Sequence, residues 1–401
     1  MGINQDHAIG FNKEVVIQPE LAADTYPAFT IPDAGNTGAA EVPTRLAALE
    51  TNFNPAQARE KRNDAGATRD YHELISGMKT VDWSIKCYIT VPAQGSATLP
   101  DWGPLMHAAM GTQTIGGTSY TYALSHAQSA CPALTISELM NDVYSMAVYG
   151  AVVDEMKISW AQGEIPALEF SGPASNWATT GTTTVNDGSP SGTSITVADG
   201  TQLSANSVIK IGSDDSTSDR GHKVASISGN VVTLTESVTG VSNSDVIIPF
   251  QDAGITTTTA SLLSGIQGQL DIGSDTDVPI LSFEATVKQN VDLRTEAGKD
   301  AAQEVILGRR DITGTISILA AKDQILKLRD REQFTTAAWT VRIGGSTSGD
   351  EKMTLTFGKV EFGFEAVSVP LDGPAVINLP FTAIATTATA TDALSIVLAT
   401  V

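Results

Sequence analysis

The sequence predicts a mainly β protein: an antiparallel β-sandwich or half-barrel with one or two short packed helices, plus an inserted small β-barrel or sandwich domain. Three observations favour this class. Several segments alternate strictly between apolar and polar residues, helical patterns are few and short, and a Gly/Ser/Thr/Asp-rich stretch interrupts the patterned strands between Trp177 and Phe250.

The clearest predicted strand runs from Val81 to Val91, where every second residue is apolar over a length typical of a half-buried strand. The same alternation predicts strands in the segments 156–160, 283–293, 339–343 and 377–381. Between Met353 and Ala366 the apolar residues move from odd to even positions. One extra residue near Gly358 and Lys359 would return both halves to one face, so we predict a β-bulge there.

Three segments have short helical patterns. The segment from Asp101 to Met110 has an acidic start, Pro104 in its first turn and Gly111 as a stop. The sequence Asp-Ala-Ala-Gln at 300–303 resembles a capping box ahead of the apolar residues 305–307. The third pattern spans 322–334, with apolar residues at helical spacing and charges on the other face.

The domain organisation follows from the change in composition. Residues 178–250 form a predicted small β domain, inserted between a first host part, 1–177, and a second host part, 251–401. Short strands are predicted at 194–197, 207–211, 223–227, 231–234 and 245–248, separated by turn residues. The ends of the insert must lie close together, and it should project from a surface loop. Residues 1–68 contain loops that suit an arm ordered on assembly.

Composition excludes several classes of function. A net charge of -21 argues against binding that neutralises nucleic-acid phosphates, because such binding needs a basic surface. Cys87 and Cys131 form neither a disulfide framework nor a CxxC metal motif. No apolar run has the length of a signal peptide or of a membrane span, so we expect a soluble protein made in a cytoplasm, with no membrane partner.

No catalytic or metal-binding pattern is convincing. The segment 345–349 has Thr347 where a nucleophile elbow needs serine, and the five histidines are scattered without metal-ligand spacing. The aspartates at 214, 215 and 219, and those at 271, 275 and 277, do not match a full calcium loop, so solvated turns are favoured. We therefore predict neither an enzyme nor a bound cofactor.

Basic residues cluster late in this acidic chain. The cluster contains Arg294, Lys299, Arg309, Arg310, Lys327, Arg329 and Arg331. It is either a solvated helix face, which is the commoner case and the one that the pattern favours, or half of a charged contact between subunits.

Two consecutive segments, YGAVVDEMKISW at 149–160 and EIPALEFSG at 164–172, resemble the tail tube proteins of tailed bacteriophages. Three more segments strengthen the resemblance: 71–79 leading into Trp83, 104–111, and 289–294 through 308–314. The resemblance covers most of the host and none of the insert. These motifs are packing signatures, and their collinear order matters more than any single match.

The resemblance implies a subunit that closes into hexameric rings, which stack into a hollow tube in the virion tail after assembly in the host cytoplasm. It implies as partners other copies of the chain, a tape measure protein, a tail terminator, and baseplate or tail-tip proteins. DNA would pass through a lumen whose carboxylates repel phosphate. Arg294, Arg309 and Arg310 are then candidates for contacts between subunits or rings.

The insert is too large for a DNA-filled lumen, so we expect it outside the tube, where a contractile sheath would leave no room for it. The resemblance therefore favours a non-contractile, siphophage-like tail. Two alternatives stay open: another tail ring protein, such as a terminator or baseplate component, or, with less support, a carbohydrate-binding or carbohydrate-processing tail protein. The last would need paired carboxylates beside a cleft, and the sequence offers none.

Overall fold

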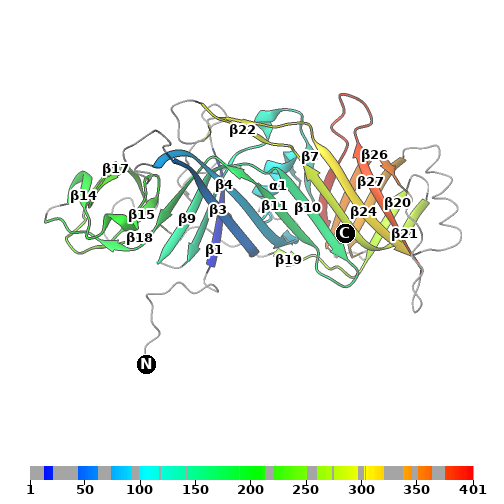
Figure 1. The fold of residues 1–401 in the computed structure, drawn as a ribbon. Helices are drawn as coiled ribbons and strands as arrows, with labels where there is room; N and C mark the ends of the chain where they lie inside the picture. The colour runs from blue at the N-terminus through cyan, green and yellow to red at the C-terminus, as the bar shows by residue number, and fades with distance from the viewer. Residues whose placement is uncertain are drawn as a thin grey trace.

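The structure is a computed structural model that describes residues 13–20, 44–61, 74–92, 99–116, 119–140, 143–188, 190–212, 221–250, 260–272, 275–296, 302, 304–319, 337–345, 351–363 and 375–400. Over these residues the chain forms antiparallel sheets and one α-helix, so the predicted mainly β class is confirmed. Figure 1 shows an elongated molecule with a small barrel at one end and larger sheets filling the rest.

Two sheets pack face to face in the centre of the molecule. The first is 5-stranded, in the order β12 (Asn176–Thr180), β9 (Tyr144–Ala151), β8 (Leu134–Met140), β1 (Lys13–Pro19) and β2 (Thr44–Leu46). The second is 13-stranded and begins with β3 (Ala48–Lys61), β4 (Leu74–Tyr88), β11 (Ala167–Ala174), β10 (Glu155–Ala161) and β21 (Asp275–Lys288). Their facing apolar residues belong to one continuous core.

Beyond β21 the second sheet closes on itself as a barrel. The closing strands are β24 (Asp311–Leu319), β27 (Val376–Ile384), β26 (Glu351–Phe362), β25 (Ala337–Gly344) and β20 (Gly268–Ile272), which pairs again with β21. Aromatic rings fill its interior: Phe381 lies 5.3 Å from Phe357 and 5.5 Å from Trp339, centroid to centroid. From β26 the sheet continues into β28 (Ser395–Thr400), β7 (Ser119–Leu124) and β6 (Gly111–Ile115).

The helix predicted at 101–110 is confirmed as α1 (Gly103–Met110), which is buried on all sides except at His107. Gly111 ends the helix with a φ of 89°, a conformation that favours glycine. The Asp101 carboxylate accepts hydrogen bonds from the Thr90 hydroxyl (2.7 Å) and from the backbone nitrogen of Ala47 (3.2 Å). It thereby ties the start of the helix to the loop between β2 and β3 and to β5 (Thr90–Pro92), which pairs with β19 (Ala260–Leu262).

The predicted β-bulge is also confirmed. Ala337 pairs with Val360, whereas Trp339 pairs with Phe357, so β26 contains one residue more than β25 between these two pairs. Phe357 and Val360 are consequently both buried. At the bulge β26 changes neighbours, from β28 before it to β27 after it.

Two predictions were wrong. Residues 304–306 are not helical: β23 (Glu304–Ile306) pairs with β22 (Asp292–Arg294) as a narrow ribbon. The strand predicted over 283–293 ends at Lys288, because Asn290 has a φ of 51° and turns the chain. The helix predicted at 322–334 lies outside the described residues. So does much of the predicted arm at 1–68, although β1 within it is a buried inner strand.

The insert has its own sheet and its own apolar core. Its 6-stranded order is β13 (Thr183–Thr184), β18 (Val246–Pro249), β15 (Val208–Ile211), β16 (His222–Ser228), β17 (Val231–Val238) and β14 (Gly192–Thr196). A bridge between Val185 and Val197 joins the two outer strands and closes a barrel. The predicted strands are all present, β13 was missed, and residues 178–180 pair in the host sheet as part of β12.

Short 3-10 turns at Gln128–Ala130 and Gly200–Gln202 complete the secondary structure of the described residues.

Candidate functional site

The described residues do not assemble the chemistry of a metal centre: no group of three or more His, Cys, Asp or Glu side chains among them could hold an ion. Asp271, one of the aspartates tested for calcium, forms an ion pair with Arg342 on the neighbouring β25. The aspartates at 214, 215 and 219 and most of the 345–349 segment lie outside the described residues. The candidate functional sites in the described residues are therefore surfaces that could contact other molecules.

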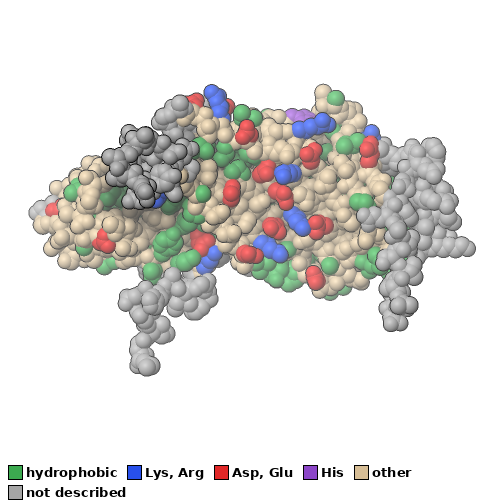
Figure 2. All heavy atoms as spheres, in the orientation of Figure 1, with side chains coloured by type: hydrophobic (Ala, Val, Ile, Leu, Met, Phe, Trp, Pro, Cys, Tyr) green, Lys and Arg blue, Asp and Glu red, His purple; other side chains and the backbone are tan. Residues whose placement is uncertain are grey.

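The broadest surface is the outer face of the second sheet. Along β4, β11, β10, β21 and β24 the apolar residues point into the core, and the alternate residues form an open polar face. Figure 2 shows acidic and basic side chains interspersed over this part of the molecule. Carboxylates outnumber lysines on the face; its charged residues are Glu50, Asp82, Glu155, Glu169, Glu284, Asp311 and Glu361 against Lys86, Lys157, Lys288 and Lys359.

Lysines in the middle of this face have carboxylates beside them on the neighbouring strands. Lys86 pairs in register with Glu50 on one side and Glu169 on the other. Lys288 pairs with Glu155 and Asp311 in the same way. Lys157 lies opposite Glu169, and its amine is 2.9 Å from the carboxylate of Glu284.

The small barrel contacts the opposite side of the sandwich. In β8 and β9 the core-facing residues alternate with residues that point away from the core, and the latter meet the barrel. The Tyr149 hydroxyl donates to the carbonyl of Asn206 (2.9 Å), and the backbone nitrogen of Thr179 donates to the Ser204 hydroxyl (2.8 Å). The barrel therefore packs against the 5-stranded sheet at one end of the molecule, whereas the open charged face belongs to the 13-stranded sheet (Figure 1).

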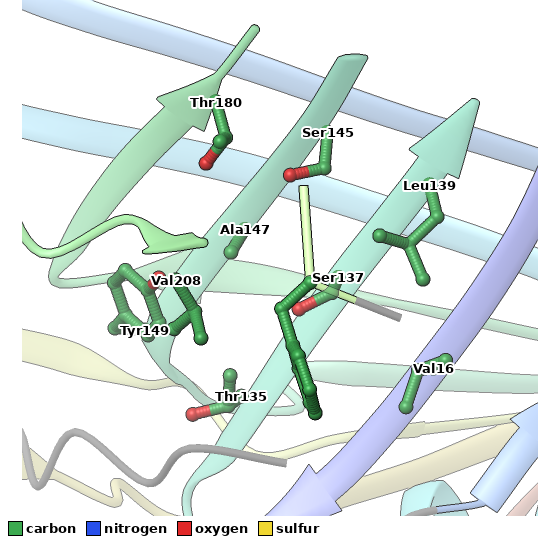
Figure 3. A pocket seen from close by; sticks show the side chains of 10 residues that line it. Val16, Thr135, Ser137, Leu139, Ser145, Ala147, Tyr149, Thr180 and Val208 are labelled. Carbon is green, nitrogen blue, oxygen red and sulfur yellow. The ribbon is translucent and has the colours of Figure 1, made fainter. Parts of the chain in front are cut away.

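A small cavity remains at this junction, as Figure 3 shows. Its volume is about 30 Å³, which holds a water molecule or two but no organic ligand. Side chains of the 5-stranded sheet and of the barrel region line it, with hydroxyls among apolar groups: Thr135, Ser137, Ser145, Tyr149, Thr180, Val208 and Phe250. Burial, and the nearby charge of Glu20, raise the pKa of Tyr149 above its ordinary range.

The three predicted contact arginines differ in exposure and in their partners within the chain. Arg294 is exposed but lies 2.6 Å from the carboxylate of Glu304 across the β22–β23 ribbon. Arg310 is half-buried and donates to the carbonyl of Ser125 (3.1 Å), and burial lowers the pKa of its guanidinium. Arg309 is exposed, and none of the described residues forms an ion pair with it.

The sequence did not single out one further group, the exposed isoleucines at the two ends of the strands. Ile165 and Ile266 project from neighbouring turns at one end, and Ile306 from the ribbon at the other. The sequence feature that could have pointed to Ile165 and Ile266 is the nearby pair of glycines, Gly163 and Gly265. Their role depends on a contact between distant segments, which the sequence does not reveal.

No protein family matches the chain, and no curated protein matches it. In the part of the chain that the structure describes, there is no helix of the length and apolar character that crossing a bilayer requires.

Proposed function

We propose that this chain is the tail tube subunit of a phage with a non-contractile tail, and that it assembles into stacked hexameric rings through which the genome passes. One observation carries the proposal: the 13-stranded sheet has an open, acid-rich face, and the inserted barrel packs against the other sheet, away from that face. The collinear motifs that resemble tail tube proteins provide independent support, since those at 149–160 and 164–172 supply β10 and β11 at the centre of that face.

The open face suits the lining of a DNA channel. A surface with excess carboxylate repels phosphate, whereas free lysines would bind it and slow its passage. Lys86 and Lys288 each lie between two carboxylates, which reduces the positive potential that they present. With this face inward, the barrel, which packs against the other sheet, stays clear of the channel and decorates the virion.

Ring closure has a structural basis in the edges of the second sheet. The sheet begins at β3 and ends at β6, and within the described residues no strand pairs with the outer edge of either. An unpaired edge exposes backbone donors and acceptors that another chain can satisfy. A repeated contact between unlike surfaces closes into a ring when the rotation permits.

In this function the partners are other copies of the chain, a tape measure protein within the tube, and terminator and tail-tip proteins at its ends. The chain acts in the virion tail after assembly in the host cytoplasm. It performs no chemistry and needs no cofactor, and DNA is in transit without tight binding.

Electron microscopy of the purified protein in negative stain, over a range of concentrations and salt, tests the proposal. We expect hollow striated tubes with outward projections, and smooth tubes when a short Gly/Ser linker replaces residues 181–250. Uniform single rings would instead indicate a terminator or baseplate component. A monomer under every condition would refute self-assembly and reopen the search for a carbohydrate-binding role.

A further inference from the structure

Exposed isoleucines lie at opposite ends of the strands of the open face. Ile165 and Ile266 are 41% and 72% exposed, and Ile306 is 43% exposed. Ala161 of β10 pairs with Ser282 at the first end, while Glu155 pairs with Lys288 at the second, just before the chain turns into the β22–β23 ribbon. About 20 Å of strand separates the two ends. Figure 1 shows them as opposite edges, with β19 along one and β22 along the other.

The first end is a rigid pair of turns. The backbone nitrogen of Glu164 donates to the carbonyl of Ala161 (3.0 Å), and that of Gly163 donates to the carbonyl of Gly265 (3.0 Å). Gly265 lies so close to the carbonyl of Glu164 that a Cβ there would collide with it. Ile165 and Ile266 each follow one of these contacting residues, so both flank the same junction.

The second end is equally well held. The backbone nitrogen of Gly308 donates to the carbonyl of Gln289 (3.0 Å), and the Asn290 side chain donates to the carbonyl of Arg309 (2.7 Å). These bonds fix the backbone that presents Arg309, while the ribbon pairing of Ile306 with Asp292 fixes the neighbouring isoleucine.

The two ends of the open face expose side chains of opposite charge, Arg309 at one end and Glu164 at the other. Arg294 and Arg310 are engaged within the chain, which leaves Arg309 as the exposed guanidinium without an ion pair among the described residues. At the other end Glu164 is exposed and, over the same described ranges, also forms no ion pair. Among the described residues, each end therefore combines exposed isoleucine with a charged side chain that forms no ion pair, and the two charges are opposite.

We infer that copies of this chain stack head to tail, with Ile306 and Arg309 of one copy against Ile165, Ile266 and Glu164 of the next. The inference rests on the proposed self-assembly and assigns the contact between rings to these residues. Because the contact joins unlike surfaces at opposite ends, it leaves a free end after each addition and the stack grows without limit. Apolar contact supplies affinity, and the ion pair sets register and selects against reversed copies.

A charge-swap cycle tests the contact. Arg309→Glu and Glu164→Arg each place like charges together, so each should raise the critical concentration for tube formation by about tenfold or more, measured by pelleting and microscopy. The double variant restores an opposite pair and should return to within about threefold of the wild type. Glu236→Arg, an exposed change on the barrel, is the matched control and should have no effect.

A disulfide trap gives a second readout that does not depend on the strength of the ion pair. Ile306 and Ile266 lie too far apart in one chain to be bridged, so a variant with Ile306→Cys and Ile266→Cys should crosslink only between copies and give a ladder of oligomers on a non-reducing gel. Either single variant should give no ladder.

The outcomes separate the two proposals. Wild-type tubes whose formation is unchanged by Arg309→Glu and Glu164→Arg, with no disulfide ladder, would overturn the stacking contact and leave the tube function intact. Failure of the wild type to assemble at all would overturn both.

Discussion

Gly265 allows two turns that are distant in sequence to pack closely, because it has no side chain. Its backbone packs against the carbonyl of Glu164, and its own carbonyl accepts from the Trp160 indole (3.0 Å) and from the backbone of Gly163. The sequence alone does not predict this role for Gly265, because the close approach involves a segment about a hundred positions away.

We expect Gly265→Ala to lower the free energy of unfolding by about 2 to 4 kcal/mol, because the backbone of Glu164 must move to accept the new methyl group. Denaturant unfolding measures this. Gly188→Ala is the control, since an added Cβ there meets no atom within 4 Å and the change should be nearly neutral. Equal stability of the two variants would contradict the close-approach argument.

The raised pKa of Tyr149 predicts that the stability of the folded protein falls at alkaline pH. Burial raises the pKa of its phenol in the folded state, whereas in the unfolded state the phenol ionises near pH 10. The unfolded state then binds fewer protons, so the tyrosine's contribution is complete below about pH 10 and is lost as pH rises above it.

Tyr149→Phe should therefore cost about 1 kcal/mol at pH 8, through loss of the hydrogen bond to Asn206, and should flatten the fall in stability between about pH 9 and 11. Thermal unfolding across this range provides the measurement. The Tyr149→Phe variant will still lose some stability as the pH rises, because burial also raises the pKa of Tyr122 and of Cys87. Parallel curves for wild type and variant would contradict the assignment.

At the scale of the element, alternation of apolar residues predicted strands wherever it persisted. The bulge in β26 was also predicted at its correct place, after Phe357. A bulge adds one residue to the strand, so the apolar residues move from odd to even positions there. The ribbon at 292–306 could not be found in this way, since strands of three residues carry no measurable period. The intrachain partners of Arg294 and Arg310, which are Glu304 and the Ser125 carbonyl, could not be predicted from the sequence for a related reason, since they depend on pairing across the fold.

Deletion of Lys359 tests the bulge. Without the extra residue, Val360 and Phe362 would move to the opposite face of β26, or the pairing with β27 would have to shift by one residue. We expect the deletion to abolish cooperative unfolding or to lower the midpoint by more than about 10 °C, whereas Lys359→Ala should change it little. Circular dichroism during heating distinguishes these results.

At the scale of the whole molecule, the separation of the charged face from the barrel depends on the packing of layers. Composition predicted the acidic excess but not its distribution, because the register of strands as distant as β4 and β21 decides which charges become neighbours. Lys86, for instance, lies between Glu50 and Glu169, which are far from each other in sequence.

Neutralising the flanking carboxylates should make the face retain DNA. We expect tubes with Glu50→Gln, Glu155→Gln, Glu169→Gln, Glu284→Gln and Asp311→Asn together to hold double-stranded DNA at low salt and to release it as salt rises, because Lys86, Lys157 and Lys288 then become available to phosphate. DNA that co-sediments with the tubes is measured against Glu236→Gln as the control. No difference in retained DNA would argue that this face does not line the channel.

The junction of the barrel with its host has a practical consequence. Thr183 and Ile247 are hydrogen-bonded neighbours, so the chain leaves the host and returns to it on adjacent strands, about 5 Å apart. Any compact module whose two termini lie that close can be exchanged for the barrel without stretching β12 or the core beneath it. Repeated around every ring, such a replacement would turn the filament into a regular scaffold that displays a chosen enzyme or antigen at fixed spacing.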